Sequence, residues 1–283
     1  MRISIYYNYL QNVLHEYPKG IDQIFIHLSI KLRRMFPKGL FYYLGEYFIL
    51  MRKVFAKPEK HRIYYKQFIR EISSLGVSSI GIVAIISAFM GAVITIQTAY
   101  NIENPLLPPY LIGVAARDSI LLEFSSTMVA LILAGKVGSS IASELGTMRV
   151  SEQIDALEIM GVNSASYLIL PKICAAMFFN PFLALLSMSI GIFGGWAVGT
   201  FVGVITTEQY ILGIRYAFNT YYITYSIIKT VVFAFIITSI SAYYGYNVSG
   251  GSIEVGQSST RAVVYSSVVI LMFNLILTQL LLS

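Results

Sequence analysis

The residues of this chain that are suited to bind a charged ligand stand inside long apolar stretches. Glu123 and Lys229 each interrupt such a stretch, and so does Lys136. Ionisable groups in an apolar environment are costly unless each has a partner, so an acid and a base there predict an ion pair or a binding site. The pattern indicates binding and not a covalent reaction.

A second group of charges lies in the segment ELGTMRVSEQIDALEIMG, residues 144–161, where four acids surround Arg149. Ser151 is a suitable N-cap and Gly161 is a suitable residue after a helix end, which predicts one short helix over Glu152–Met160. An acidic helix of this length is too charged to enter a bilayer and too short to cross one.

An apolar stripe runs along this predicted helix. Val150, Ile154 and Leu157 follow the i, i+4, i+7 spacing, which puts them on one face. Such a stripe is suited to dock into another protein. The alternative is that it packs on the ends of the chain's own helices while the acids are solvated.

The sequence contains no pattern for a metal, redox or nucleotide site. The single cysteine, Cys174, rules out an internal disulfide, and three scattered histidines lack metal-ligand spacing: His15, His27 and His61. The Gly135-Lys136 pair is followed by Val137, where a phosphate-binding loop needs Ser or Thr. We therefore expect no cofactor and no catalytic residue in this chain.

The composition is that of an integral membrane protein. The chain is 56% hydrophobic and 12% charged, with a mean hydropathy of +0.69. A crossing helix needs about 20 mostly apolar residues. Five segments qualify and predict an all-α protein with five transmembrane helices: 76–98, 119–141, 173–206, 223–246 and 262–282.

The basic residues predict the orientation. Of the 20 Lys and Arg residues, 13 precede residue 76, interleaved with Tyr and Phe. This favours an anionic membrane surface over nucleic acid as their partner. With that segment in the cytoplasm, residues 142–172 are also cytoplasmic and the C-terminus lies outside.

Three regions follow from this organisation. Residues 1–36 form an N-terminal extension, cytoplasmic or interfacial, and residues 37–75 form interfacial helices, of which Gly39 to Phe55 is the clearest. Residues 76–283 form the five-span domain. The third apolar run is too long for one perpendicular crossing, so it must tilt or bend, and Pro181 is suited to kink it.

Small residues mark the second half of that third run. Gly191, Gly194, Gly195 and Gly199 supply faces for close helix packing. They serve either packing within one subunit or a seam between two subunits.

The run AGKVGSSIASELGTMRVSEQIDALEIMG, residues 134–161, closely resembles the signature of the MlaE (YrbE) permease family. These permeases are membrane subunits of lipid-transporting ABC systems associated with MCE proteins. The resemblance covers roughly residues 60–283 and includes further blocks in the family order: MGAVITIQ, GIFGGW, IKTVVFA and STRAVVYSSV.

The resemblance implies a coupling helix that docks in a groove of an ATPase subunit. The residues that it places at this contact are Glu152, Gln153, Asp155 and Leu157, and the apolar stripe adds Ile154 as an anchor beside Leu157. It implies three protein partners: an MlaF-like ABC ATPase that binds ATP and Mg²⁺, an MlaD-like MCE protein, and a small STAS-type subunit bound to the ATPase.

A lipid site is expected near the outer leaflet. Glu123 and Lys229 both fall about 6–10 Å below the outer interface by helical rise, facing each other or a phospholipid headgroup. Side chains of the first span are suited to line a slot for the tails: Phe89, Met90, Val93, Ile94 and Gln97. A structural ion pair and ordinary helix packing are the alternatives, and Lys136 is expected to snorkel to the inner interface.

The chain departs from the family pattern at this site. Family members usually read Arg-Glu-(Phe/Leu)-Gly-Pro, whereas this chain has Leu122 before Glu123 and Ser125-Ser126 in place of Gly-Pro. An acid common near the end of the last span is here Asn274. We therefore expect no arginine contact, and a pocket that either accepts a different headgroup or is less polar.

The resemblance implies a homodimeric permease of a Gram-negative inner membrane. It is expected to carry phospholipid between that membrane and a periplasmic MCE protein, which maintains outer-membrane lipid asymmetry. The alternatives are an ATPase-independent channel or secondary transporter, and a membrane scaffold for an MCE protein.

Overall fold

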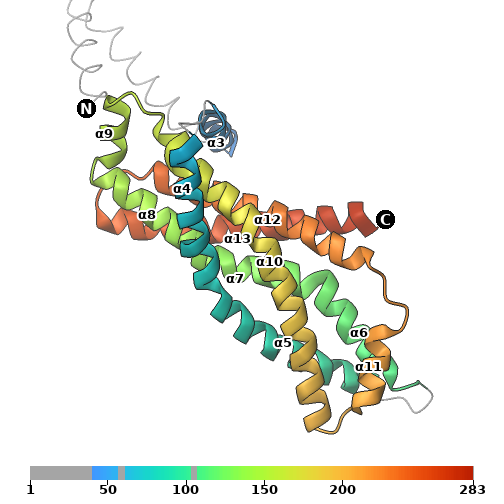
Figure 1. The fold of residues 1–283 in the computed structure, drawn as a ribbon. Coiled ribbons are helices and arrows are strands. Elements are labelled where there is room, and N and C mark those ends of the chain that lie inside the picture. The colour runs from blue at the N-terminus through green and yellow to red at the C-terminus, as the bar shows by residue number, and fades with distance from the viewer. Residues whose placement is uncertain (1–39, 57–60, 103–106, 283) are drawn as a thin grey trace, which may run out of the picture. The chain divides into compact units, whose positions relative to one another are not determined.

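The computed structural model describes residues 40–56, 61–102 and 107–282, and these residues form helices without a strand (Figure 1). They divide into two units, with residues 40–49 in one and residues 50–282 in the other. The helix predicted over Gly39 to Phe55 is present as α3, Leu40–Val54. The predicted extension 1–36 lies outside the described residues.

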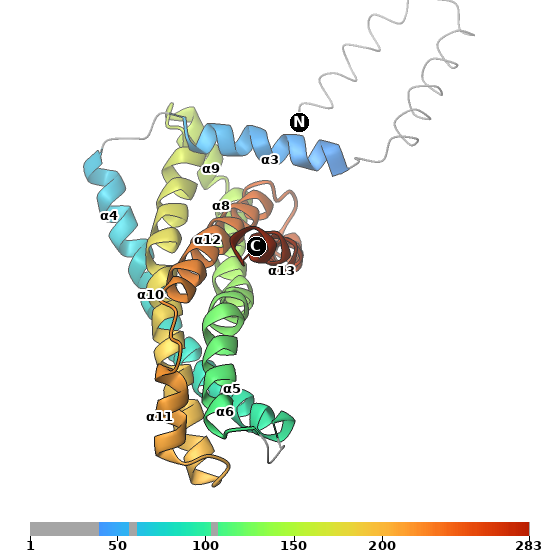
Figure 2. The ribbon, with the colours of Figure 1, turned by 90° about the vertical axis from the view of Figure 1, so that its right-hand side faces the viewer.

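The five predicted membrane spans are confirmed as long apolar helices: Tyr64–Asn101, Tyr110–Val150, Ser164–Phe201, Tyr221–Tyr246 and Ser252–Leu282. The last three spans are single helices: α10, Ser164–Phe201; α12, Tyr221–Tyr246; and α13, Ser252–Leu282. Two short helices connect spans at opposite ends, α9, Gln153–Ile159, and α11, Thr207–Arg215 (Figures 1 and 2).

The first two spans change helix type along their length. The first consists of α4, His61–Glu71; π-helical η2, Ile72–Gly76; 3₁₀-helical η3, Val77–Ser79; and α5, Ile80–Asn101. The second consists of α6, Tyr110–Ser119; π-helical η4, Ile120–Met128; α7, Val129–Leu133; π-helical η5, Ala134–Gly138; and α8, Ser139–Val150. π-helical segments are rare and frequently mark functional sites.

The spans are longer than the sequence predicts. The first three contain 38, 41 and 38 residues, or about 57–62 Å of helix at 1.5 Å per residue. The first begins within the region predicted as interfacial helices, because α4 continues through η2 without a break. The third run is one helix, and it passes both Pro171 and Pro181 as continuous α-helix, so neither proline breaks it.

Glycines let α5 and α10 approach until their backbones touch. A Cβ atom on Gly91 would lie 1.9 Å from the carbonyl oxygen of Gly191, and one on Gly194 would lie 2.3 Å from that of Ala88. Gly195 meets the Thr95 hydroxyl at 2.3 Å in the same way. These glycines therefore serve packing within one subunit, the first of the two alternatives drawn from the sequence.

The remaining spans pack around α12. This helix contacts α8, α10 and α13, and α13 in turn contacts α8 (Figure 2). Many apolar side chains of α13 are exposed, Leu275 and Leu280 among them, as expected for a surface that faces lipid or another protein.

We expect Gly91→Ala to destabilise the unit by about 1–3 kcal/mol, because the added methyl group collides with the backbone of α10. Gly81→Ala in the same helix is the matched control, since its Cβ meets nothing within 4 Å. Thermal unfolding of the purified protein in detergent measures both. Equal unfolding temperatures for the two variants would contradict the packing described.

Candidate functional site

The acid and base predicted at membrane depth form an ion pair. Lys229 Nζ of α12 lies 3.0 Å from Glu123 Oε1 of η4, and their side chains are 0% and 40% exposed. The lysine also donates to the Tyr225 hydroxyl at 3.0 Å and lies 4.8 Å from the centre of the Tyr225 ring. A fully buried ammonium group is thus satisfied by an anion, a hydroxyl and an aromatic face.

Side chains of the last span complete this network. Asn274 donates its amide to Glu123 Oε2 at 3.1 Å, and Thr278 donates to Glu123 Oε1 at 3.3 Å. Thr127 lies 3.0 Å from both the Asn274 amide oxygen and Glu123 Oε2. Asn274 therefore does what a second acid would not do, because an amide donates to the carboxylate instead of repelling it.

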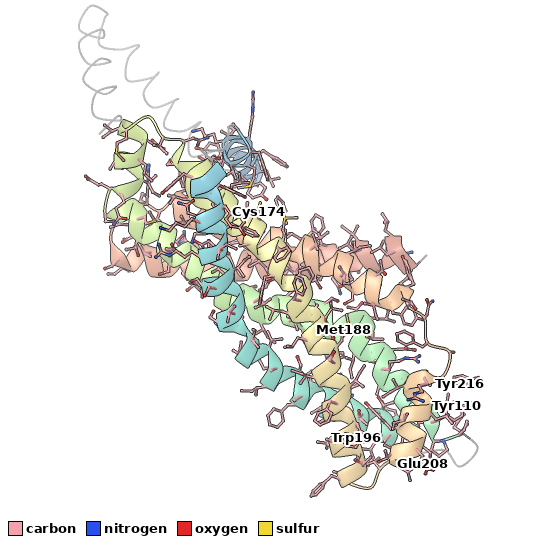
Figure 3. All side chains as sticks on the ribbon, in the orientation of Figure 1. Tyr110, Cys174, Met188, Trp196, Glu208 and Tyr216 are labelled. Atoms are coloured by element: carbon pink, nitrogen blue, oxygen red, sulfur yellow. The ribbon has the colours of Figure 1, made fainter. Side chains whose placement is uncertain are left out.

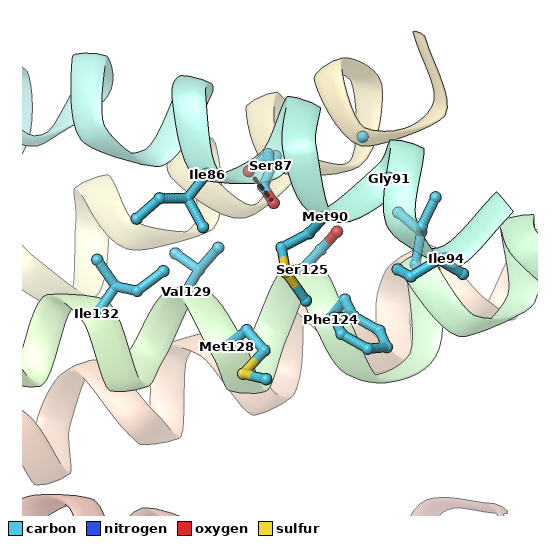
Figure 4. A pocket seen from close by; sticks show the side chains of 13 residues that line it. Ile86, Ser87, Met90, Gly91, Ile94, Phe124, Ser125, Met128, Val129 and Ile132 are labelled. Atoms are coloured by element: carbon cyan, nitrogen blue, oxygen red, sulfur yellow. Dashed lines mark hydrogen bonds between the residues drawn. The ribbon is translucent and has the colours of Figure 1, made fainter. Parts of the chain in front are cut away.

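A small cavity lies between α5, α10 and the second span, and it is lined by Phe124 and Ser125, which follow Glu123 in the sequence (Figure 4). Its volume is about 20 Å³, room for one water molecule and not for an acyl chain. Met90 and Ile94 line it, and Ser87 and Ser187 hydrogen-bond at 2.8 Å on its wall. Ser125 also faces it, with a buried hydroxyl that has no hydrogen-bond partner among the described residues.

The residues predicted to line a lipid slot divide between two faces of α5. Met90 and Ile94 face the cavity, whereas Phe89 and Val93 are 70% and 53% exposed. Gln97 is exposed on the same side as Phe89 and Val93, as the i, i+4, i+8 spacing dictates. The predicted stripe is therefore not one surface in this conformation.

The helix predicted in the acidic segment is present, but its start differs from the prediction. Ser151 is not its N-cap, because the Ser151 hydroxyl donates back to the Thr147 carbonyl at the end of α8. Glu152 takes the cap position with a left-handed φ of 60°, and α9 begins at Gln153. Gly161 follows the helix with φ 77°, as predicted.

Three of the four acids bind partners within the chain. Asp155 pairs with Arg149 at 2.6 Å, and Glu144 pairs with Lys172 at 2.7 Å. Glu158 accepts hydrogen bonds from Tyr246 at 2.9 Å and from Ser164 at 3.1 Å. Glu152, in contrast, is exposed.

The apolar stripe is the part of the prediction that needs correction. Ile154 has no exposed surface and Leu157 is partly buried, since α9 packs against α8 and α10. An exposed ridge that includes Ile154 is therefore wrong. The alternative, in which the stripe packs on the ends of the chain's own helices, holds at Ile154, which positions the helix, although three of the acids have partners and are not simply solvated. The exposed apolar side chains are instead Ile159, at 87%, and Met160, at 68%, which the stripe analysis missed.

Two buried cations were not recognised from the sequence. Lys172 of α10 is 2% exposed and binds Glu71 at 2.8 Å as well as Glu144. Arg117 of α6 is 1% exposed and donates to the carbonyls of Ile214 at 2.8 Å and Tyr216 at 2.7 Å, at the end of α11. Carbonyls at a helix C-terminus attract a cation.

The same end of the unit is held by aromatic contacts. The rings of Tyr110 and Tyr216 lie 5.0 Å apart between α6 and α11 (Figure 3). Tyr210 is buried, and its hydroxyl donates to the Ile192 carbonyl at 3.1 Å. Burial raises the pKa of Tyr210 above its ordinary value, although the hydrogen bond with Thr95 acts in the opposite direction. The hydroxyl therefore remains a donor at neutral pH.

Lys136 joins the first two spans at their irregular segments. It is partly buried and lies in η5, and its ammonium group donates to the Ser78 carbonyl of η3. A 3₁₀ segment leaves carbonyl groups without their usual helical partner, and a lysine is suited to satisfy one of them.

The sequence of this chain is similar to those of known membrane proteins. The family model described as Permease MlaE matches residues 68–280. The chain belongs to the MlaE permease family. A probable ABC transporter permease protein of Rickettsia bellii is 33% identical over 237 residues, covering 84% of this chain and 91% of that relative.

Relatives with more specific names occur in other organisms. The intermembrane phospholipid transport system permease protein MlaE of Haemophilus influenzae is 31% identical over 232 residues, covering 82% of this chain and 88% of that relative. The chloroplastic protein TRIGALACTOSYLDIACYLGLYCEROL 1 of Arabidopsis thaliana is 31% identical over 231 residues, covering 82% and 66%. As a MlaE-family member, the chain is the non-catalytic permease component of an ABC transporter, and that class of transporter includes an ATPase.

We expect the two halves of the ion pair to differ in their contribution to stability. Glu123→Met leaves Lys229 buried without an anion and should cost about 3–5 kcal/mol. Lys229→Met should cost less, because Glu123 is partly exposed and keeps Asn274 and Thr127. Unfolding of the single and double variants in a double-mutant cycle measures the difference. Additive effects in the double variant would contradict a direct interaction.

Proposed function

We propose that this permease moves phospholipid between the membrane in which it lies and an MCE-domain protein, driven by ATP hydrolysis on an MlaF-like ATPase. The main support is α9, a short helix that connects the second and third spans and carries exposed side chains at both of its ends. In this proposal ATP and Mg²⁺ bind to the ATPase, and the permease works as a homodimer in a bacterial inner membrane with its N-terminus in the cytoplasm.

The proposed ATPase contact combines charge at the start of α9 with apolar area at its end. Ile159 and Met160 are the apolar anchors, and Glu152 and Gln153 are exposed at the start of the helix. Apolar anchors give affinity when they are buried, and acids steer the encounter with a basic groove. Leu157 and Asp155 are partly exposed, whereas Ile154 is buried where α9 packs against α8 and α10.

The backbone at Glu152 supports a functional role for its side chain. Its left-handed conformation costs a non-glycine residue about 1–2 kcal/mol. Glycine would remove that cost, and a glutamate in this strained conformation supports a role for its carboxylate.

The proposed lipid path runs beside the Glu123–Lys229 pair. In this conformation Glu123 and Lys229 bind each other, and the cavity is too small for a lipid tail. Separation of α5 from η4 would enlarge the cavity between Met90, Ile94 and the second span. A lipid phosphate is then able to replace Glu123 as the partner of Lys229.

The transport step follows from these two parts. Closure of the ATPases moves α9, which is fixed to the end of α8 by the Asp155–Arg149 pair and to the start of α10 by the hydrogen bond between Glu158 and Ser164. Movement of α9 therefore moves two spans. This changes the separation of helices around the cavity and exposes the lipid to the MCE partner.

We expect Ile159→Asp plus Met160→Asp to remove the ATPase from the complex, because two apolar anchors become charged. Affinity purification of the tagged protein from mild detergent, with mass spectrometry of proteins and lipids, measures this. The wild type should bring an ABC ATPase, an MCE protein and phospholipid. Phe201→Asp is the control, since Phe201 is 93% exposed at the opposite end of α10.

An ATPase that is absent from the wild-type sample, with the permease folded, would contradict the proposal and favour a channel or secondary transporter. Phospholipid bound equally by the wild type and by the folded Glu123→Met/Lys229→Met double variant would instead show that the pair is only structural.

We expect Glu152→Gly to raise the unfolding free energy by about 1 kcal/mol and to weaken ATPase binding. Ala217→Gly is the matched control, because Ala217 is the other non-glycine residue with a positive φ, 47°, in the described part of the chain. It should stabilise the protein without changing the amount of ATPase recovered. Full ATPase recovery with Glu152→Gly would show that this carboxylate is not part of the contact.

A further inference from the structure

Lys172 binds two carboxylates that come from two other helices. Its Nζ lies 2.8 Å from Glu71 of α4 and 2.7 Å from Glu144 of α8, while Lys172 itself belongs to α10. The three side chains differ in exposure, with 3% for Lys172, 16% for Glu71 and 49% for Glu144. One buried cation thus joins the ends of the first three spans.

The two carboxylates come from helices with different neighbours. α4, which ends at Glu71, packs against α10, whereas α8 packs mainly against α12 and α13. Glu71 therefore binds a lysine on the helix against which its own helix packs, whereas Glu144 binds a lysine on a helix that is not a main neighbour of α8. α10 and α8 are linked through α12, which contacts both, and through α9, which joins them in the chain.

This arrangement makes one of the two contacts easy to break. A buried lysine without an anion is strongly unfavourable, but Lys172 keeps Glu71 when Glu144 leaves. Glu144 is half exposed, so its carboxylate returns to water at little cost. With a single acid, the same movement would leave a buried charge unpaired.

The backbone beside Glu71 points to the same conclusion. Glu71 is the last residue of α4, and the π-helical segment Ile72–Gly76 follows it directly. The lysine therefore holds α4 to α10 at the residue before the first span becomes irregular. That contact is suited to persist while α8 moves.

We propose that Lys172 is the positioning residue of an ionic latch: it holds Glu144 of α8 in the conformation seen here and releases it, while keeping Glu71, when α9 is moved. The latch rests on the proposed function only in taking the ATPase as the source of that movement. Its release separates the inner end of α8 from α4 and α10.

The test uses spin labels on either side of the latch in the complete transporter. Lys66 of α4 and Thr147 of α8 are exposed and are replaced by cysteine in a Cys174→Ser background. Distances between the labels are measured by electron paramagnetic resonance, without nucleotide and with ATP bound to a hydrolysis-deficient ATPase. The wild type should show one distance without nucleotide and a second, longer one with ATP.

Glu144→Gln should populate the longer distance without nucleotide about fivefold more than the wild type does, and should lower the lipid moved per ATP hydrolysed by a similar factor. Lys172→Arg keeps the charge and should behave like the wild type. Glu208→Gln is the matched control, since Glu208 is exposed in α11 at the opposite end. If Glu144→Gln fails to assemble, Glu144→Asp should give a smaller shift in the same direction.

Distance distributions of Glu144→Gln or Glu144→Asp that equal those of the wild type would overturn the latch. Recovery of the ATPase with the wild-type permease is checked in the same samples. If no ATPase is recovered, the proposed function fails. If the ATPase is recovered and the distances do not change, the latch alone fails.

Discussion

The low dielectric of a membrane interior requires each buried cation to find its partners within the protein, and this requirement ties the helices of the chain together. Arg117 joins α6 to the end of α11, Lys172 joins α4, α8 and α10, and Lys229 joins η4, α12 and α13. Lys172 and Lys229 each have partners on two other helices, whereas Arg117 binds its neighbour Asp118 and several carbonyls at the end of α11. The arrangement of the spans therefore depends on a few charges as much as on apolar packing.

These contacts between helices differ in how easily they are broken. Arg117 binds backbone carbonyls, which stay in place as long as α11 is folded, so the α6–α11 end is expected to move as one piece. The α5–α10 contact is similarly rigid, because glycine backbones touch. Lys172 and Lys229, in contrast, bind partly exposed carboxylates that other partners are able to replace. The carboxylates of these two exchangeable contacts both lie on the second span, Glu144 near α9 and Glu123 at the level of the cavity.

The number and type of the spans were predictable from the sequence, because hydrophobic length alone determines them. The short helix α9 and the glycine packing were also predictable, from Gly161 at the helix end and from small-residue spacing, although the predicted N-cap Ser151 was wrong. The orientation of α9 was not, since the left-handed turn at Glu152 changes which face meets the chain and buries Ile154 instead of Ile159. The partners of Lys172 were equally hidden, because Glu71 lies 101 positions away in the sequence.

The most direct test of the account is site-specific photo-crosslinking at Met160 in living cells. A photoreactive amino acid at this position should crosslink to the ABC ATPase, because Met160 is 68% exposed at the end of α9. The same probe at Phe201, at the opposite end of α10, should not reach the ATPase. ATPase crosslinks from Phe201, or from neither position while the complex is intact, would contradict a coupling role for α9.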